Sequence, residues 1–392
     1  MSKSTDPQYQ RRFRTNSTRR ALTITGALLW VLNCGQSPVP STEETSPVTV
    51  EPVQSSTTAP AIAPVLVTEP VAVDSDDPAI WIHPEDPTKS LILGTDKGGA
   101  VYAFDLDGQI LEDKTVSGLA RINNVDVGYG LQLDGTPTDI AVATERPTSS
   151  LKVYRLPEMT AIDGGGIEIF VGQEAANRPM GVALYKRPTD GALFAIVSRK
   201  EGPSGAYLWQ YRLQDDGSGT VEAVKVREFG EFSGTGEIEA VAVDNELGYV
   251  YYSDEGAGIH KYHADPDAQD ANVELALFGT DGFAQDREGI SIYKIDDGTG
   301  YILVSDQQAN AFRIFTREGA PGYPHDHQFI KSVAVSTNES DGSEVTSAAL
   351  NASFPNGLFI AMSDDKTFHL YSWQDVAGED LVLAPNGQRS AE

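Results

Sequence analysis

The chain is built from short segments in which apolar and polar positions alternate, and one two-strand pattern occurs six times. Each copy has an apolar strand ending in Ser or Thr and a charged residue, then a polar turn and a strand containing an aromatic residue. A short apolar run and an alternation with a period of two both predict β-strands. The six hairpins are predicted at 91–104, 140–154, 194–211, 249–262, 301–315 and 358–371.

The copies recur at a regular spacing. Their Ser or Thr positions, from Thr95 to Ser363, lie between 49 and 58 residues apart, which is typical of arrayed units. Another apolar strand precedes each hairpin, and an outer strand is expected to follow it. The earlier strands are predicted at 78–82, 125–129, 181–185, 240–243, 289–293 and 344–350.

These repeats predict an all-β protein, a six-bladed β-propeller of four-stranded antiparallel sheets. A single sheet of this kind cannot bury both of its apolar faces, whereas radial stacking buries them and leaves only short strand edges. The segment Val67 to Val73 precedes the first inner strand and would supply the outer strand of the last blade, closing the ring. A parallel solenoid is the alternative, but its repeats are usually shorter.

The first 66 residues have a different character. Residues 1–33 combine a basic start with the apolar run Ala21 to Leu32, which is short for a membrane span and indicates an export signal. The single cysteine, Cys34, follows Val-Leu-Asn as in a lipoprotein cleavage box, and a lipidated Cys34 would tether the protein to a membrane. Residues 34–66 read as a disordered Ser/Thr/Pro-rich linker, and residues 67–392 as the propeller domain. We therefore expect an exported protein that is periplasmic, anchored to the outer membrane or extracellular.

Charge limits the range of partners. The chain has 57 Asp and Glu against 29 Lys and Arg, a formal net charge of −28. Such a chain repels nucleic acid, so cations are the natural partners. A monomer is expected.

The repeat also indicates where charged residues meet, because equivalent turns of a propeller lie around one opening. Acids precede the inner strands close to the predicted channel, where repulsion and desolvation would be costly without a neutralising cation. Carboxylate and amide oxygens without His or Cys favour calcium over zinc. These acids are Asp76, Asp77, Asp126, Glu237, Glu239, Asp286, Glu288 and Asp341.

Basic residues follow the second strands of the first three blades. Lys97, Arg146 and Lys200 are expected to face the acids of blades four and five across the mouth. An opening that is cationic on one side and loaded with metal on the other suits a polyanionic substrate.

Several stretches resemble the β-propeller phytases, secreted calcium-dependent enzymes that remove phosphate from inositol hexakisphosphate (phytate). The most specific are Asp76-Asp77-Pro-Ala-Ile-Trp81 and Ile122-Asn-Asn-Val-Asp126, with Arg199-Lys200-Glu201-Gly202 and Asp286-Arg-Glu288-Gly-Ile in support. The resemblance extends from about residue 69 to 375.

The resemblance implies roles for particular residues. Asp77, Glu239 and Glu288 would be catalytic, Lys97, Arg146 and Lys200 would bind phosphate, and a water bound to Ca²⁺ would attack the phosphate of phytate or its calcium complex. The implied metal ligands are Asp76, Asp77, Glu239, Glu255, Asp286, Glu288 and Asp341.

The chain departs from the family pattern at three positions, and two alternatives stay open. Gly98, Gly128 and Met180 stand where the family commonly has a basic residue, a longer side chain and an aromatic residue, which bears on substrate affinity. A propeller that binds calcium outside the cell without catalysis, or a propeller hydrolase of another ester, would share the same fold.

Overall fold

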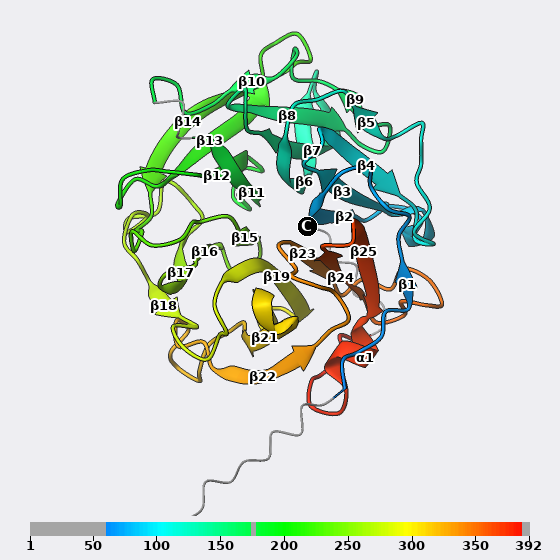
Figure 1. Ribbon diagram of the computed structural model, residues 1–392. Helices are drawn as coiled ribbons and strands as arrows, with labels where there is room; N and C mark the ends of the chain where they lie inside the picture. The colour runs from blue at the N-terminus through cyan, green and yellow to red at the C-terminus, as the bar shows by residue number, and fades with distance from the viewer. Residues whose placement is uncertain (1–59, 174–177, 386–392) are drawn as a thin grey trace, which may run out of the picture. The chain divides into compact units, whose positions relative to one another are not determined.

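The structure is a computed structural model that describes residues 60–173 and 178–385. Six antiparallel sheets stand radially around a central opening, as Figure 1 shows. The predicted six-bladed β-propeller is therefore confirmed. Helix is scarce within the described residues: one short α-helix, α1 (Trp373–Ala377), and two 3₁₀ turns, η1 (Pro87–Lys89) and η2 (Gln307–Ala309).

Each blade is named here from its innermost strand outward. Blade 1 has β2 (Ser75–Trp81), β3 (Leu91–Asp96), β4 (Ala100–Phe104) and β5 (Val116–Ser117). Blade 2 has β6 (Ile122–Leu133), β7 (Thr136–Glu145), β8 (Ser150–Arg155), β9 (Thr160–Ala161) and β10 (Ile167–Glu168). Blade 3 has β11 (Pro179–Lys186), β12 (Leu193–Arg199), β13 (Leu208–Asp215) and β14 (Val221–Phe229).

The other three blades follow the same order. Blade 4 has β15 (Val241–Asp244), β16 (Tyr249–Asp254), β17 (Gly258–His263) and β18 (Ala276–Phe278). Blade 5 has β19 (Arg287–Asp296), β20 (Thr299–Asp306), β21 (Ala311–Thr316) and β22 (Phe329–Ala334). Blade 6 has β23 (Ser343–Thr346), β24 (Leu358–Ser363), β25 (Thr367–Ser372) and β1 (Leu66–Val67).

The ring is closed by a strand from the start of the folded chain. Strand β1 pairs antiparallel with β25, with Leu66 opposite Leu370, so the first and last parts of the propeller share one sheet (Figure 1). This closure lies at Leu66–Val67, at the start of the predicted segment 67–73. Ile62 also forms a bridge with Val335, so contacts with the propeller begin within residues that we assigned to the linker.

Apolar side chains of neighbouring blades pack against each other. One cluster joins Val142 of blade 2 to Val197 of blade 3, and another brings Phe312 of blade 5 within 4.8 Å of the ring of Phe359 in blade 6. Both faces of a blade are thus covered, and in blade 1 every residue of the second strand, β3, is buried.

The repeated hydroxyl residues join successive blades. The Thr144 hydroxyl donates a 2.6 Å hydrogen bond to the Met180 carbonyl of the next blade, and Ser253 donates a 2.6 Å bond to the Arg287 carbonyl. Ser198 and Ser305 make the corresponding bonds to the next blades. In these four blades the hydroxyl bonds to a backbone carbonyl of the next blade, which accounts for the periodic Ser and Thr.

The predicted export signal, Cys34 and linker residues up to 59 lie outside the described residues. No helix within the described part of the chain is long and apolar enough to cross a membrane.

Candidate active site at the propeller mouth

One backbone hydrogen bond recurs in all six blades and marks the mouth. In each blade, the residue after the second strand donates its N–H to the carbonyl of a residue just before the inner strand, at 2.7–3.4 Å. The donor and acceptor pairs are Lys97/Asp74, Arg146/Arg121, Lys200/Arg178, Glu255/Glu237, Gln307/Asp286 and Asp364/Asn338. Because these pairs occupy equivalent places, all twelve residues lie at the same end of their blades.

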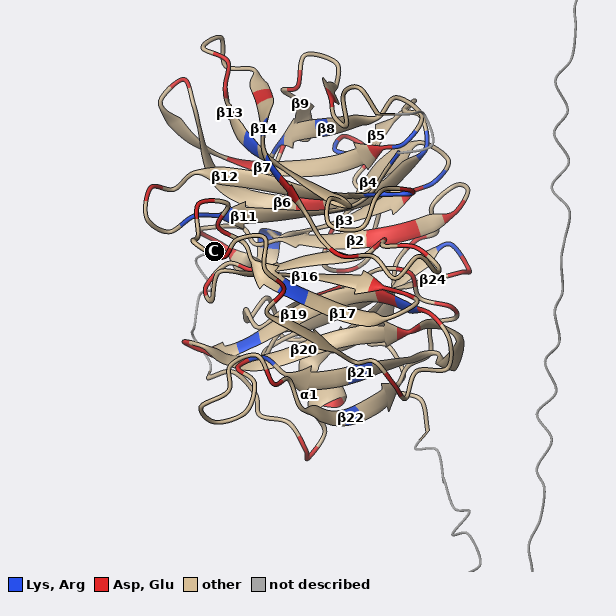
Figure 2. Cartoon of the chain, turned by 90° about the vertical axis from the view of Figure 1, so that its left-hand side faces the viewer, with Lys and Arg blue, Asp and Glu red and all other residues tan. Residues whose placement is uncertain are grey.

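Bulges bring further polar residues to this end. The pairing of β2 with β3 shifts register between Ser75 and Pro78, and the pairings of β6, β11 and β19 with their neighbours shift at the corresponding place. A bulge turns side chains out of the regular pleat. In blade 1 it presents Asp76 and Asp77 at the mouth, and Figure 2 shows the acidic ends of β2 and β16 on the same side of the ring.

The acids predicted as metal ligands meet here. Burial raises the pKa of Asp76 well above its usual range, and repulsion from Glu239 and Asp341 adds to the rise. Burial likewise raises the pKa of Glu288, with Glu239 and Glu255 adding repulsion. We call this group the acid cluster. Its members are Asp76, Asp77, Glu239, Glu255, Asp286, Glu288 and Asp341.

The residues of the acid cluster come from four blades, and the three that were predicted to be catalytic interact with one another. Asp77 comes from blade 1 and interacts electrostatically with Glu239, and Glu239 interacts with Glu288. Asp77 is held by the Val125 N–H at 3.2 Å, and it packs against Gly342, where a Cβ would lie 2.4 Å from Asp77 Oδ1. The glycine is required because any side chain there would displace the carboxylate.

Lys97 lies among the acids. Its Nζ is 2.8 Å from Asp341 Oδ2, 3.1 Å from Asp76 Oδ1 and 4.0 Å from Asp74 Oδ2. Burial disfavours its charge, but Asp76 and Asp341 outweigh that effect and raise the pKa of Lys97. The nearest carboxylates to Lys97 are thus in its own blade and in blade 6, because ring closure places blade 1 beside blade 6; Glu239 of blade 4 acts on it at longer range.

The oxygens of this site suit a hard cation. Asp76 Oδ2 and Asn124 Oδ1 are buried and accept no hydrogen bond from the described residues. Such oxygens, together with carboxylates that repel one another, are the ligands calcium prefers. Within residues 60–173 and 178–385, no three His, Cys, Asp or Glu side chains are placed closely enough to hold a metal ion. The acids of the cluster are therefore of the type that binds calcium, but they are not already arranged as a metal site.

The basic side of the mouth is larger than the sequence analysis predicted. Arg146 and Lys200 lie in blades 2 and 3 as expected, and Arg121 and Arg178 lie opposite them through the recurring backbone hydrogen bonds. Burial lowers the pKa of Arg146, and Arg121 and Arg178 contribute to the shift as like charges. Applying the repeat to every residue directly before an inner strand would have found both additional arginines.

The three departures from the family pattern have packing explanations. A Cβ at Gly98 would lie 2.4 Å from Val73 Cγ2, and a Cβ at Gly128 would lie 2.9 Å from side-chain carbons of Leu184 and Leu193. The Met180 side chain is 1% exposed, inside the blade 3 wall. Larger side chains at the two glycines would require their neighbours to move.

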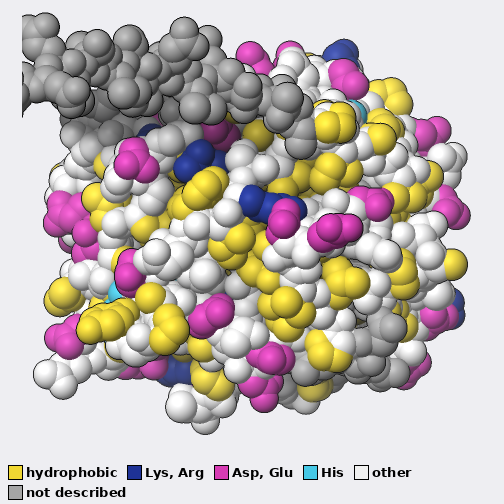
Figure 3. Space-filling view, turned by 90° about the horizontal axis from the view of Figure 1, so that it is seen from below, with side chains coloured by type: hydrophobic (Ala, Val, Ile, Leu, Met, Phe, Trp, Pro, Cys, Tyr) yellow, Lys and Arg dark blue, Asp and Glu magenta, His cyan; other side chains and the backbone are white. Residues whose placement is uncertain are grey.

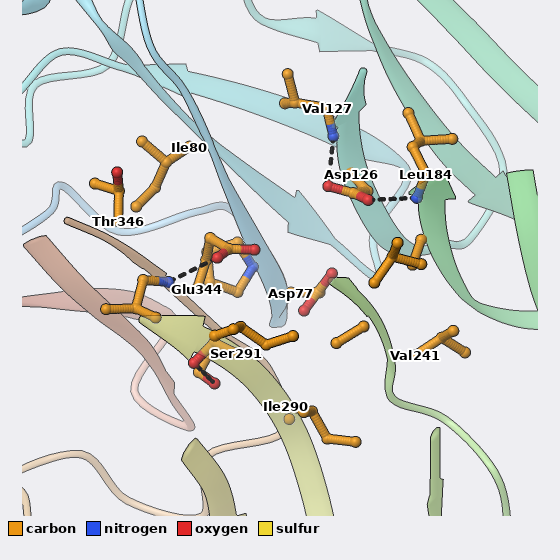
Figure 4. Close-up of a pocket in the computed structure, with 18 of the residues that line it drawn as sticks. Asp77, Ile80, Asp126, Val127, Leu184, Val241, Ile290, Ser291, Glu344 and Thr346 are labelled. Carbon is orange, nitrogen blue, oxygen red and sulfur yellow. Dashed lines mark hydrogen bonds between the residues drawn. The ribbon is translucent and has the colours of Figure 1, made fainter. Parts of the chain in front are cut away.

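A narrow cavity of about 100 Å³ continues inward from the mouth between the inner strands. Figure 4 shows Asp77, Asp126 and Glu344 around it, on β2, β6 and β23. The Asp126 carboxylate accepts 2.6 Å hydrogen bonds from the N–H groups of Val127 and Leu184. Asp126 is therefore stabilised by two backbone amides, whereas Asp77 of the cluster accepts one, from Val125.

Outside the mouth, charge is more dispersed. On the side shown in Figure 3, acidic side chains are scattered among apolar and uncharged ones. Several bases form ion pairs, as Arg187 does with Asp190, Asp265 and Asp267.

Fold and site together define a six-bladed propeller whose one mouth holds a buried acid cluster beside a group of arginines. The sequence profile of the phytase family matches residues 25–375, and the chain belongs to the phytase family of enzymes. It is 30% identical over 333 residues to a 3-phytase of Bacillus subtilis (strain 168), a match covering 79% of this chain and 83% of that protein. Among solved structures, the computationally designed protein Ika8 matches with a TM-score of 0.41 at 10% identity, covering 76% of this chain and 70% of Ika8, a likeness too weak to bear on function.

Proposed function

We propose that this protein releases inorganic phosphate from phytate in a calcium-dependent reaction. Family membership and the similarity to a 3-phytase support the substrate. One contact carries the proposal: the Asn123 side-chain amide donates a 2.5 Å hydrogen bond to Glu239 Oε1, and its oxygen accepts from Arg146 Nη1 at 3.4 Å. A single buried side chain thus joins the acid cluster to a phosphate-binding arginine.

The protein groups have separate tasks in this proposal. Arg146 and Lys200 would bind phosphate oxygens and orient the ester, since guanidinium and ammonium groups donate charge-assisted hydrogen bonds. Asp77, Glu239 and Glu288 would hold the attacking water and accept its proton, which suits carboxylates whose pKa is raised by burial and like charges. Calcium bound by the acid cluster would neutralise phosphate oxygens and lower the pKa of water.

The direct test is a phosphate-release assay on phytate with calcium and with excess chelator. Activity should require calcium, and Glu288→Gln should lower kcat/KM about 100-fold or more because it removes a buried charge from the cluster. Glu112→Gln is the matched control, since Glu112 is exposed and lies outside the mouth. Phosphate release that persists in excess chelator would refute calcium dependence.

We also propose that the chain is exported and acylated at Cys34. The apolar run that ends just before this cysteine supports the proposal. Cells expressing the full chain should incorporate labelled palmitate, and Cys34→Ser should move the protein from the membrane fraction to the soluble fraction. Equal fractionation of the two proteins without labelling would rule out acylation.

A further inference from the structure

Arg287 stands between two acids of the cluster in sequence, but its side chain reaches into the neighbouring blade. It begins β19, the inner strand of blade 5, with Asp286 before it and Glu288 after it. The pairing of β19 with β20 shifts register between Arg287 and Ile290, so this end of the strand leaves the regular pleat. Arg287 is only 8% exposed, and it forms no ion pair within residues 60–173 and 178–385. Its charge is therefore not there to neutralise one particular acid.

The guanidinium group of Arg287 makes three hydrogen bonds, all to main-chain carbonyls of blade 4. Nη1 donates to the Glu255 carbonyl at 2.8 Å. Nε donates to the Gly279 carbonyl at 2.7 Å, and Nη2 donates to the Thr280 carbonyl at 3.0 Å. Glu255 follows β16 and the other two acceptors follow β18, so one side chain joins two loops of blade 4 to the inner strand of blade 5. Only a guanidinium group presents donors on three nitrogens in one plane.

Further contacts fix the turn that carries Glu255. The Ser253 hydroxyl, two residues earlier, donates to the Arg287 carbonyl at 2.6 Å. The Glu255 N–H donates to the Glu237 carbonyl at 3.2 Å. The Glu255 side chain lies over Gly236, where a Cβ would be 2.4 Å from Glu255 Oε2. The turn is thus held by its own blade on one side and by Arg287 of blade 5 on the other.

The position of Glu255 matters because its partners in the acid cluster belong to the other blade. Glu255 is hydrogen-bonded to Glu288 and repelled by Asp286, both on blade 5. Carboxyl groups from two blades keep a set separation only if the boundary between the blades is fixed. Arg287 crosses this boundary directly beside all three acids.

We propose that Arg287 is a positioning residue for the calcium site, holding the main chain of Glu255 at the distance from Asp286 and Glu288 at which these acids bind calcium together. Residues that orient metal ligands without contacting the metal often contribute strongly to its affinity. The inference rests on the proposed function, because calcium is the ion that the acid cluster is proposed to bind.

Isothermal titration with calcium tests the inference. Arg287→Met should bind calcium about tenfold or more weakly than the parent, as expected for the loss of a residue that orients a metal ligand. Removing a positive charge near the cluster would by itself strengthen cation binding, so weaker binding reports lost positioning and not altered charge. Arg287→Lys keeps the charge but cannot span the three carbonyls, and its affinity should fall between those of the parent and Arg287→Met.

Arg313→Met is the matched control. Arg313 stacks on the same Phe283 ring as Arg287, with its guanidinium carbon 4.9 Å from the ring centroid against 4.7 Å for Arg287. Its hydrogen bond goes to the Gly282 carbonyl of the same loop instead of to Glu255. Arg313→Met should therefore loosen this loop and leave the calcium affinity within about twofold of the parent's.

Thermal melts in chelator, together with phytate hydrolysis by the parent, separate the possible outcomes. If Arg287→Met melts at a lower temperature but binds calcium as tightly as the parent, Arg287 is only structural and the inference fails, whether or not the parent is a phytase. If Arg287→Met does not fold, Arg287→Lys decides, and an affinity equal to the parent's overturns the inference. If the parent binds calcium without hydrolysing phytate and Arg287→Met weakens that binding, the proposed function fails and the positioning role stands.

Discussion

The ammonium group of Lys97 lies 2.8 Å from Asp341 Oδ2, although 244 residues separate the two in sequence. The contact joins the first blade to the last across the closure of the ring. Lys97 is also 3.1 Å from Asp76, so one cation is shared between two acids of the cluster. In the absence of calcium, Lys97 is the main protein charge that offsets their repulsion.

Lys97→Met should therefore destabilise the calcium-free protein by about 2 kcal/mol, because it leaves buried carboxylates without their cation. The effect should be much smaller with saturating calcium, which would supply the missing positive charge. Thermal melts in chelator and in calcium measure the difference. Lys89→Met is the control, since its side chain is 68% exposed. Equal losses in both conditions would show that Lys97 does not take the place of a calcium ion in the acid cluster.

The stability of the calcium-free protein should fall as pH rises from about 4.5 to about 7. Burial, followed by repulsion from Asp286, raises the pKa of Glu255 to about 7. The folded state then binds more protons than the unfolded state in this window, so unfolding becomes easier with increasing pH. Glu255→Gln should flatten the profile in urea titrations in chelator. A profile as steep as the parent's would assign the effect to other acids.

The buried pair of Asp244 and Arg317 should be important for stability. Arg317 Nε and Nη2 lie 2.6 and 2.7 Å from the two Asp244 oxygens, and both side chains are fully buried. Asp244→Asn should cost about 3 kcal/mol in urea denaturation, because the arginine charge loses its buried bidentate partner and keeps only Glu246, which is partly exposed. Asp244→Asn/Arg317→Met should recover part of this loss. A double variant less stable than Asp244→Asn would contradict a pairwise interaction.

Lys261 should give a stability increase at alkaline pH. Burial lowers its pKa to about 8, and its ammonium group donates to the Pro324 carbonyl at 2.9 Å. Between pH 8 and the ordinary lysine pKa of about 10.5 the unfolded state binds more protons, so stability rises with pH in that window. The difference in unfolding free energy between the parent and Lys261→Met isolates this effect. A difference that does not change with pH would show that Lys261 titrates normally.

The sequence predicted the blades well because their signal is local. Alternating apolar positions and a hydroxyl before each charged turn recur about every 50 residues. Four of the six hydroxyls bond to a carbonyl of the next blade, and that of Thr95 bonds to its own inner strand. The meeting of Asp77, Glu239 and Glu288 followed from the same repeat, since rotational symmetry turns equal positions in the repeat into neighbours around the mouth.

The repeat in the sequence could not predict which charged side chains contact one another. The repeat places Lys97 and Asp341 at the same end of their blades, but only the closed ring brings blade 1 against blade 6 and their charges to 2.8 Å. Similarly, Asn123 was recognised as part of a motif, whereas its role between Glu239 and Arg146 depends on the bulge in β6.

By itself, then, the sequence determined the number of blades, their order and most of the residues at the mouth, because strand periodicity and turn chemistry act over a few residues. Only the tertiary structure decided which charges pair and which repel. Those outcomes depend on distances of a few ångströms between blades, and electrostatic energies change steeply with separation and burial.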